Sequence, residues 1–175
     1  MAIYRYTASA DNTITNAFTS NLLESHRGSG SNMGFADALE VFSIYGQASS
    51  SAGQSQELSR ALINFSTTSI AADRTSGKIP ASGSVSFYLR MFNARTPFTL
   101  PQDFTLVIAP VSRSWAEGTG LDMDEYKDLG KSNWMSASNT TAWTNVGGDY
   151  RTGSNYQVTF EQGYEDIELD VTELM

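Results

Sequence analysis

The sequence predicts an all-β protein built as an antiparallel sandwich or barrel, with one or two short helical turns in its loops. Two observations favour this fold class. Apolar and polar residues alternate in many short segments, and stretches rich in Gly, Ser, Asn and Asp separate these segments. A third observation agrees with them, because no long segment shows the 3.6-residue period of an amphipathic helix.

The clearest strand is predicted over residues 84–93, where Val85, Phe87, Leu89 and Met91 fall on one face. The same alternation predicts strands at 104–108 and 167–172, and residues 61–65 are interpreted as a strand with two apolar faces. Turn-rich connections are predicted at 28–34, 48–56, 73–83 and 147–155, and the best helical candidates are 34–39 and 123–129.

Length and composition indicate one domain over residues 1–175, with no internal repeat and no linker that divides it. The absence of cysteine excludes disulfides, a thiolate nucleophile and a cysteine-ligated metal. No apolar run approaches the length of a membrane-spanning helix, and no secretory signal is recognised at the start of the sequence, so membrane insertion is not expected. A net charge of −8 argues against a nucleic-acid partner.

The segment 111–134 holds an acidic run, Asp122, Asp124, Glu125 and Asp128, between two tryptophans. Carboxylates are calcium ligands, so Asp122, Asp124 and Asp128 are candidates for a Ca²⁺ site. The run departs from the calcium-loop pattern of EF-hands, which has a central glycine and a distal glutamate. The preferred interpretation is a solvated acidic turn in which Asp122 or Asp124 caps a short helix.

The tryptophans offer another candidate site, in which Trp134 and Trp143 stack on a sugar ring and Asn145, Asp149 and Tyr150 supply hydrogen bonds. The alternative places the two rings at an intersubunit contact. Trp115, at the end of a predicted strand, is expected in the core.

Catalytic candidates are few. His26 is the only histidine and lacks partners for a triad or a zinc site, so a solvated loop histidine is expected. Glu117 with Glu125 or Asp122 would supply the two carboxylates of a glycosidase. Acidic residues are common near turns, so this pairing indicates little, and the sequence predicts no enzyme.

The order of several motifs resembles the DNRLRE-type β-sandwich family. These motifs are Ala10-Asp11 with Thr13-Ile14, GSNMG before Leu39-Glu40-Val41, SRALINF at 59–65, GSVSFYLRMFNA at 83–94, VSRSWAEG at 111–118, AWTNVGGDY at 142–150 and DVTEL at 170–174. The phrases EVFSIYGQ, ELSRALI, GLDMDEYKDLG and SNW are similar to structural proteins of tailed bacteriophages, cyanophages especially.

The resemblance implies a jelly-roll-like sandwich that forms the N-terminal part of a longer protein. It also implies a non-enzymatic structural or decoration module on the tail, fibre or head surface of a virion. Its partners would be other virion proteins, further copies of itself or a host-surface glycan, contacted by loops 28–34, 48–56, 119–134 and 144–155. The alternative is a carbohydrate-binding module of a polysaccharide-active enzyme or of a phage receptor-binding domain.

Overall fold

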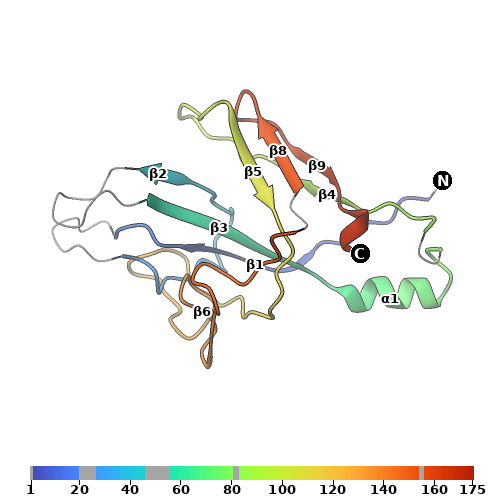
Figure 1. Ribbon diagram of the computed structural model, residues 1–175, viewed down its shortest axis with the longest axis horizontal. Helices are drawn as coiled ribbons and strands as arrows, with labels where there is room; N and C mark the ends of the chain where they lie inside the picture. Colours follow the sequence, from blue (N-terminus) through green and yellow to red (C-terminus); the bar gives the residue numbers. More distant parts are fainter. Residues whose placement is uncertain (1, 20–26, 46–55, 81–82, 154–155) are drawn as a thin grey trace. The chain divides into compact units, whose positions relative to one another are not determined.

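The computed structural model describes residues 2–19, 27–45, 56–80, 83–153 and 156–175 (Figure 1). Among the residues that the structure describes, strands make up 32% and helix only 8%, and the strand pairs are antiparallel, so the fold is β-rich as predicted. The chain divides into two compact units. The first unit contains residues 1–66 and 113–149, and the second contains residues 67–112 and 150–175. The single domain over 1–175 stays a prediction.

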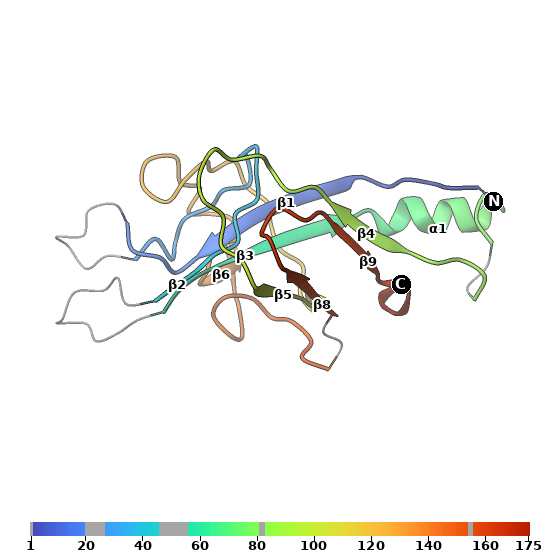
Figure 2. The ribbon, with the colours of Figure 1, turned by 90° about the horizontal axis from the view of Figure 1, so that it is seen from above.

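A three-stranded sheet in the order β1-β3-β2 organises the first unit. Its strands are β1 (Ala8–Thr15), β2 (Ser43–Tyr45) and β3 (Gln56–Phe65). Figures 1 and 2 both show β1 and β3 side by side, and their register runs from Ala8 opposite Phe65 to Thr15 opposite Ser59. The predicted strand at 61–65 is the second half of β3. The first half was missed because Gln56, Glu57 and Ser59 interrupt the apolar pattern.

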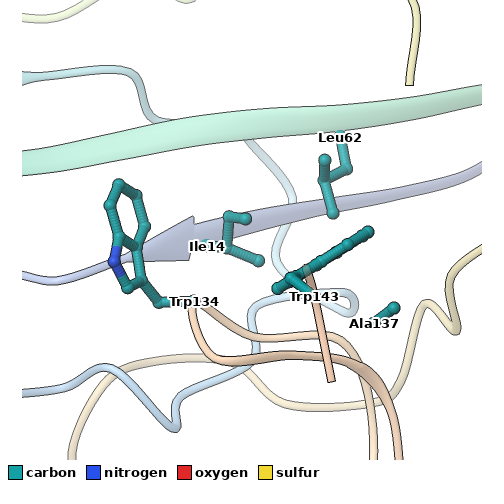
Figure 3. Packing of buried hydrophobic residues seen from close by; sticks show 5 residues of the cluster. All are labelled: Ile14, Leu62, Trp134, Ala137 and Trp143. Atoms are coloured by element: carbon teal, nitrogen blue, oxygen red, sulfur yellow. The ribbon is translucent and has the colours of Figure 1, made fainter. Parts of the chain in front are cut away.

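The core of the first unit lies where β1 and β3 meet the segment that follows Ala116. Ile14 from β1 and Leu62 from β3 pack with Trp134, Ala137 and Trp143 (Figure 3), and Trp115 packs against this cluster as predicted. Burying one such aliphatic side chain contributes about 1.5–3 kcal/mol. The core therefore anchors the chain around the two indoles to the sheet.

A short hairpin of β6 (Ser136–Ser138) and β7 (Thr141–Ala142) lies between the two buried tryptophans in the sequence. The indole N–H of Trp143 donates to the carbonyl oxygen of Asn133 at 2.8 Å, which satisfies the polar atom of a buried ring. The guanidinium carbon of Arg60 lies 5.0 Å from the centre of the Trp134 ring, and its Nη1 donates to the carbonyl of Gly147 at 2.6 Å. These contacts fix the hairpin on β3.

The second unit contains two antiparallel strand pairs. One joins β4 (Tyr88–Met91) to β9 (Ile167–Asp170), and the other joins β5 (Phe104–Ile108) to β8 (Tyr156–Phe160). The rings of Phe104 and Phe160 stack with their centres 4.7 Å apart. A 3-10 turn, η1 (Thr172–Leu174), follows β9. The strands predicted at 104–108 and within 84–93 and 167–172 are confirmed.

The helix predictions are wrong. The residues at 34–39 and 123–129 form turns and bends, and the helix is α1 (Thr67–Thr75) in the second unit. Only Ile70 of α1 is buried, so its sequence carries no apolar stripe from which a helix could be predicted. Within the described residues, no helix has the length and apolar character needed to cross a membrane.

Candidate binding surface

A buried asparagine in the first unit draws three loop segments together. The side chain of Asn32 has no exposed surface; its Nδ2 donates to the carbonyl oxygens of Glu117 and of Ser132, the latter at 2.9 Å. Its Oδ1 accepts the N–H groups of Gly34 at 3.1 Å and Gly120 at 3.0 Å. One amide thus satisfies four backbone groups, which holds the loops in one arrangement.

A second buried asparagine ties the same loops to the sheet. Asn12 of β1 is fully buried, and its Nδ2 donates to the carbonyl oxygen and the hydroxyl of Ser132 at 3.0 and 2.8 Å. Its Oδ1 accepts the N–H of Met33 at 2.8 Å. The loops are therefore carried by β1 and not only by one another.

Asp122 shapes the acidic loop from within. Its Oδ1 accepts the backbone N–H groups of Asp124, Glu125 and Tyr126 at 2.8, 2.8 and 3.1 Å. The pKa of Asp122 is lowered chiefly by these N–H groups, with a smaller effect from Lys127. Asp122 accepts backbone N–H groups as a cap would, but they belong to a bend, so the predicted role as the cap of a short helix is wrong.

Asp128 closes the other end of this loop. Its Oδ2 accepts the N–H and the hydroxyl of Thr119 at 3.1 and 3.2 Å. Among the residues that the structure describes, no three His, Asp or Glu side chains gather in a group that could hold a metal ion. Asp122, Asp124 and Asp128 therefore do not converge as the calcium candidate requires, because two of them bind different parts of the loop backbone.

This loop exposes Thr119, Glu125 and Lys127 as well as apolar side chains. The exposed apolar side chains are Phe35 on the neighbouring segment, which is 69% exposed, and Leu121, Tyr126 and Leu129 of the loop, which are 42%, 59% and 67% exposed. They come from two connected segments, since the N–H of Phe35 donates to the carbonyl of Gly120 at 2.9 Å and that of Leu121 to Tyr126 at 2.7 Å. We call these four residues, together with Asp124 and Glu125, the acidic–apolar face.

Asp149 organises a separate turn of the first unit. Its carboxylate pairs with Nε of Arg113 at 2.6 Å and accepts the N–H groups of Thr144 at 3.1 Å and Asn145 at 2.9 Å. The pKa of Asp149 is lowered to about 2, first by the N–H groups of Asn145 and Thr144 and then by Arg113. Asp149 is 8% exposed, so it holds the turn and does not offer its carboxylate to a ligand.

The structure corrects the sugar-stacking site. Trp134 and Trp143 are only 7% and 5% exposed, and both belong to the core cluster (Figure 3). Their faces are covered by protein, so neither ring is presented as a platform. Asn145 is exposed on the turn that Asp149 holds.

Tyr150 is 43% exposed and lies in the second unit, next to the residue at which the first unit ends. The five predicted binding residues are thus two core rings, one exposed turn residue, one buried turn-forming carboxylate and one exposed tyrosine.

No family model, curated protein or solved structure matches this chain.

The carboxylates considered as a glycosidase pair, Glu117 with Glu125 or Asp122, are not brought together by the described contacts. The Oε1 of Glu117 accepts the N–H of Asp11 on β1 at 2.8 Å. Burial raises the pKa of Asp11, and the negative charge of Glu117 raises it further. Glu117 is thus directed to β1, and the described contacts give no pairing with Glu125 or Asp122. His26 and most of the loop 48–56 lie outside the described residues.

Sequence reasoning missed Asn12, Asn32 and a third asparagine, Asn133. The Oδ1 of Asn133 accepts the N–H groups of Met135 and Ser136 at 2.8 and 2.9 Å. The sequence has five Ser-Asn pairs, and those at 31–32 and 132–133 stand directly before Met33 and Trp134, which are buried; this was the available signal for Asn32 and Asn133, and Asn12 had none of this kind.

Proposed function

We propose that this chain is a non-enzymatic structural or decoration module of a tailed-phage particle. It folds as a jelly-roll-like β-sandwich, resides in the virion and works through protein contacts made by its loops. Support comes from the motif order in the sequence and from the antiparallel β-rich fold.

The main structural support for this proposal is the acidic–apolar face. Large apolar side chains exposed by a loop with few internal bonds would need no explanation. Here, however, Asn32, Asp122 and Asp128 use their polar atoms to hold the backbone, while Phe35 and Leu129 remain about two-thirds exposed. Rigid loops that present apolar groups are typical of protein–protein contacts, because little ordering entropy is lost on binding.

The glycan-binding alternative loses its main support, because stacking on a sugar requires an accessible ring face and Trp134 and Trp143 are buried.

Mass spectrometry of purified particles of the phage that encodes the chain tests the proposal. We expect the chain at a copy number comparable to that of other minor virion proteins, and immunogold label on intact particles. Absence from the particles, or a lyase domain encoded on the same polypeptide, would overturn it.

A further inference from the structure

We infer that the acidic–apolar face binds a cationic segment of a different protein chain, one that carries Lys or Arg beside apolar side chains. The inference rests on the proposed function, since it names the partner chemistry for the same face. Its basis is the combination of exposed apolar groups with the charge that surrounds them.

The apolar part of the face is set out by the loop geometry. Leu121 and Tyr126 flank the bend that Asp122 holds, and their backbones are joined by a 2.7 Å hydrogen bond. Leu129 lies close to Gly30: a Cβ atom built on Gly30 would be 3.3 Å from the Leu129 Cδ2. Phe35 is attached to the same loop through Gly120. Contact between these side chains and a partner removes apolar surface from water, which is the main source of affinity.

The charge of the face selects the sign of the partner. Residues 119–129 contain four acidic residues and one lysine, a net charge of −3. Asp124 and Glu125 lie between Leu121 and Tyr126 in the sequence, so negative charges stand among the apolar residues, and Lys127 is the one cation beside them. A partner with Lys or Arg around an apolar centre complements this pattern, whereas an anionic ligand is repelled.

The same charge argues against a second copy of this chain as the occupant. The first unit contains eleven acidic and six basic residues, a net charge of −5, and the whole chain carries −8. Two such surfaces repel one another, which disfavours self-association at this face. The occupant is therefore a different, basic chain.

Two synthetic peptides test the inference with the full chain: a Leu/Lys amphipathic peptide and a matched peptide with Glu in place of Lys. Fluorescence anisotropy of the labelled peptides is measured at low and high salt. We expect the Leu/Lys peptide to bind, the Leu/Glu peptide to bind at least tenfold more weakly, and the affinity to fall with added salt.

Two double variants assign the binding to the face. Asp124→Asn with Glu125→Gln removes two charges, and Tyr126→Ser with Leu129→Ser removes apolar surface. Each is expected to weaken binding of the Leu/Lys peptide about three- to thirtyfold. The matched control, Asp103→Asn with Glu161→Gln, removes the same two charges from exposed positions of the second unit and is expected to leave binding within about twofold. Near-ultraviolet circular dichroism verifies that every variant is folded.

Equal losses in the control and the face variants, equal binding of the two peptides, or no binding of the Leu/Lys peptide would each overturn the inference. Sedimentation that shows self-association abolished by Leu129→Ser would overturn it in favour of a second copy. These outcomes are separate from the particle test. A chain present in virions that binds neither peptide refutes the cationic partner alone, and a chain absent from virions refutes the structural role.

Discussion

Substitution of Asn12 by aspartate tests whether the buried asparagines hold the loops to the sheet. The replacement keeps the size of the side chain and keeps an oxygen for the N–H of Met33. It also exchanges the Nδ2 donor for an oxygen that faces the carbonyl of Ser132, now 3.0 Å from Nδ2. Because residue 12 is fully buried, the second oxygen of an ionised carboxylate there faces the Ser132 carbonyl without exposure to water, and the Ser132 hydroxyl, now 2.8 Å from Nδ2, is the one donor described within its reach.

The magnitude follows from protonation. The folded variant can avoid the buried charge by keeping a proton, which then donates to the Ser132 carbonyl. An aspartic acid has an ordinary pKa of about 3.9, so holding it protonated at about pH 7 costs roughly 4 kcal/mol, at about 1.4 kcal/mol per pH unit. One of the two Nδ2 bonds is lost in addition, at about 1 kcal/mol. The sum of about 5 kcal/mol is an upper limit, because the Ser132 hydroxyl can donate to an ionised carboxylate, and we expect a destabilisation of about 3–5 kcal/mol near pH 7.

The destabilisation by Asn12→Asp should change with pH in a definite direction. In the variant, the folded-state pKa of the introduced carboxyl group is raised above its unfolded value. The penalty therefore grows as the pH rises above about 4, and it shrinks towards about 1 kcal/mol as the pH falls to that value. Urea unfolding followed by tryptophan fluorescence measures the difference from wild type at each pH. Asn12→Leu is the control: leucine does not titrate, so the loss of stability in this variant should not depend on the pH. A small penalty for Asn12→Asp that does not vary with pH would refute the reasoning.

Three further predictions concern the first unit. The Asp149 carboxylate has a pKa of about 2 in the folded protein and 3.8 ordinarily, so it stabilises the fold above about pH 4 and loses this contribution as the pH falls towards 2. In Asp149→Asn, the acid-unfolding curve should lack this pH-dependent contribution. Trp143→Phe deletes the 2.8 Å indole hydrogen bond and leaves a buried carbonyl unpaired; urea unfolding should show a loss of about 1–3 kcal/mol. Gly118→Ala forces a methyl group to within 2.5 Å of the Asn32 Oδ1 at a φ of 87°, and Gly148→Ala forces a comparable φ with open space around it. Both substitutions carry roughly 1–2 kcal/mol of backbone strain. Thermal unfolding should show that Gly118→Ala destabilises the protein by more than this amount and by more than Gly148→Ala does. Equal destabilisation by the two variants would contradict the packing around Asn32.

The strands of the second unit could be predicted because each is half-buried. Along β5 the burial alternates from residue to residue, and Phe104, Leu106 and Ile108 share the inner face. Such a strand carries a period of two in its sequence. β1 gave no such signal, because Asn12, Thr13, Ile14 and Thr15 are all buried and three of them are polar. Alternation between apolar and polar residues disappears where both faces of a strand are covered.

The candidate site was harder to predict because local polarity was taken as a sign of exposure. Trp134 and Trp143 stand among Ser, Asn and Thr residues, which suggested an accessible surface. In the structure, Asn133 accepts two backbone N–H groups and offers its carbonyl to Trp143, so the polar neighbours satisfy one another and exclude water from the rings. A polar segment whose groups hydrogen-bond to one another can be as buried as an apolar segment. The sequence alone does not show which polar groups pair in this way.

In the acidic run, two carboxylates bind the loop backbone, and large apolar side chains are exposed. The oxygens of Asp122 and Asp128 are directed to backbone N–H groups, and the residues left for a partner are Tyr126, Leu129 and their neighbours. The close approach of backbone segments around Asn32 makes this arrangement possible, since a Cβ at Gly120 would overlap the Asn32 carbonyl oxygen. Any side chain at that position would separate the two loops and release the N–H groups that the amide of Asn32 satisfies. The acids therefore determine how the loop is held, and the apolar side chains determine the contact area that it offers. A substitution at Gly120 should disable the acidic–apolar face without altering any residue in it.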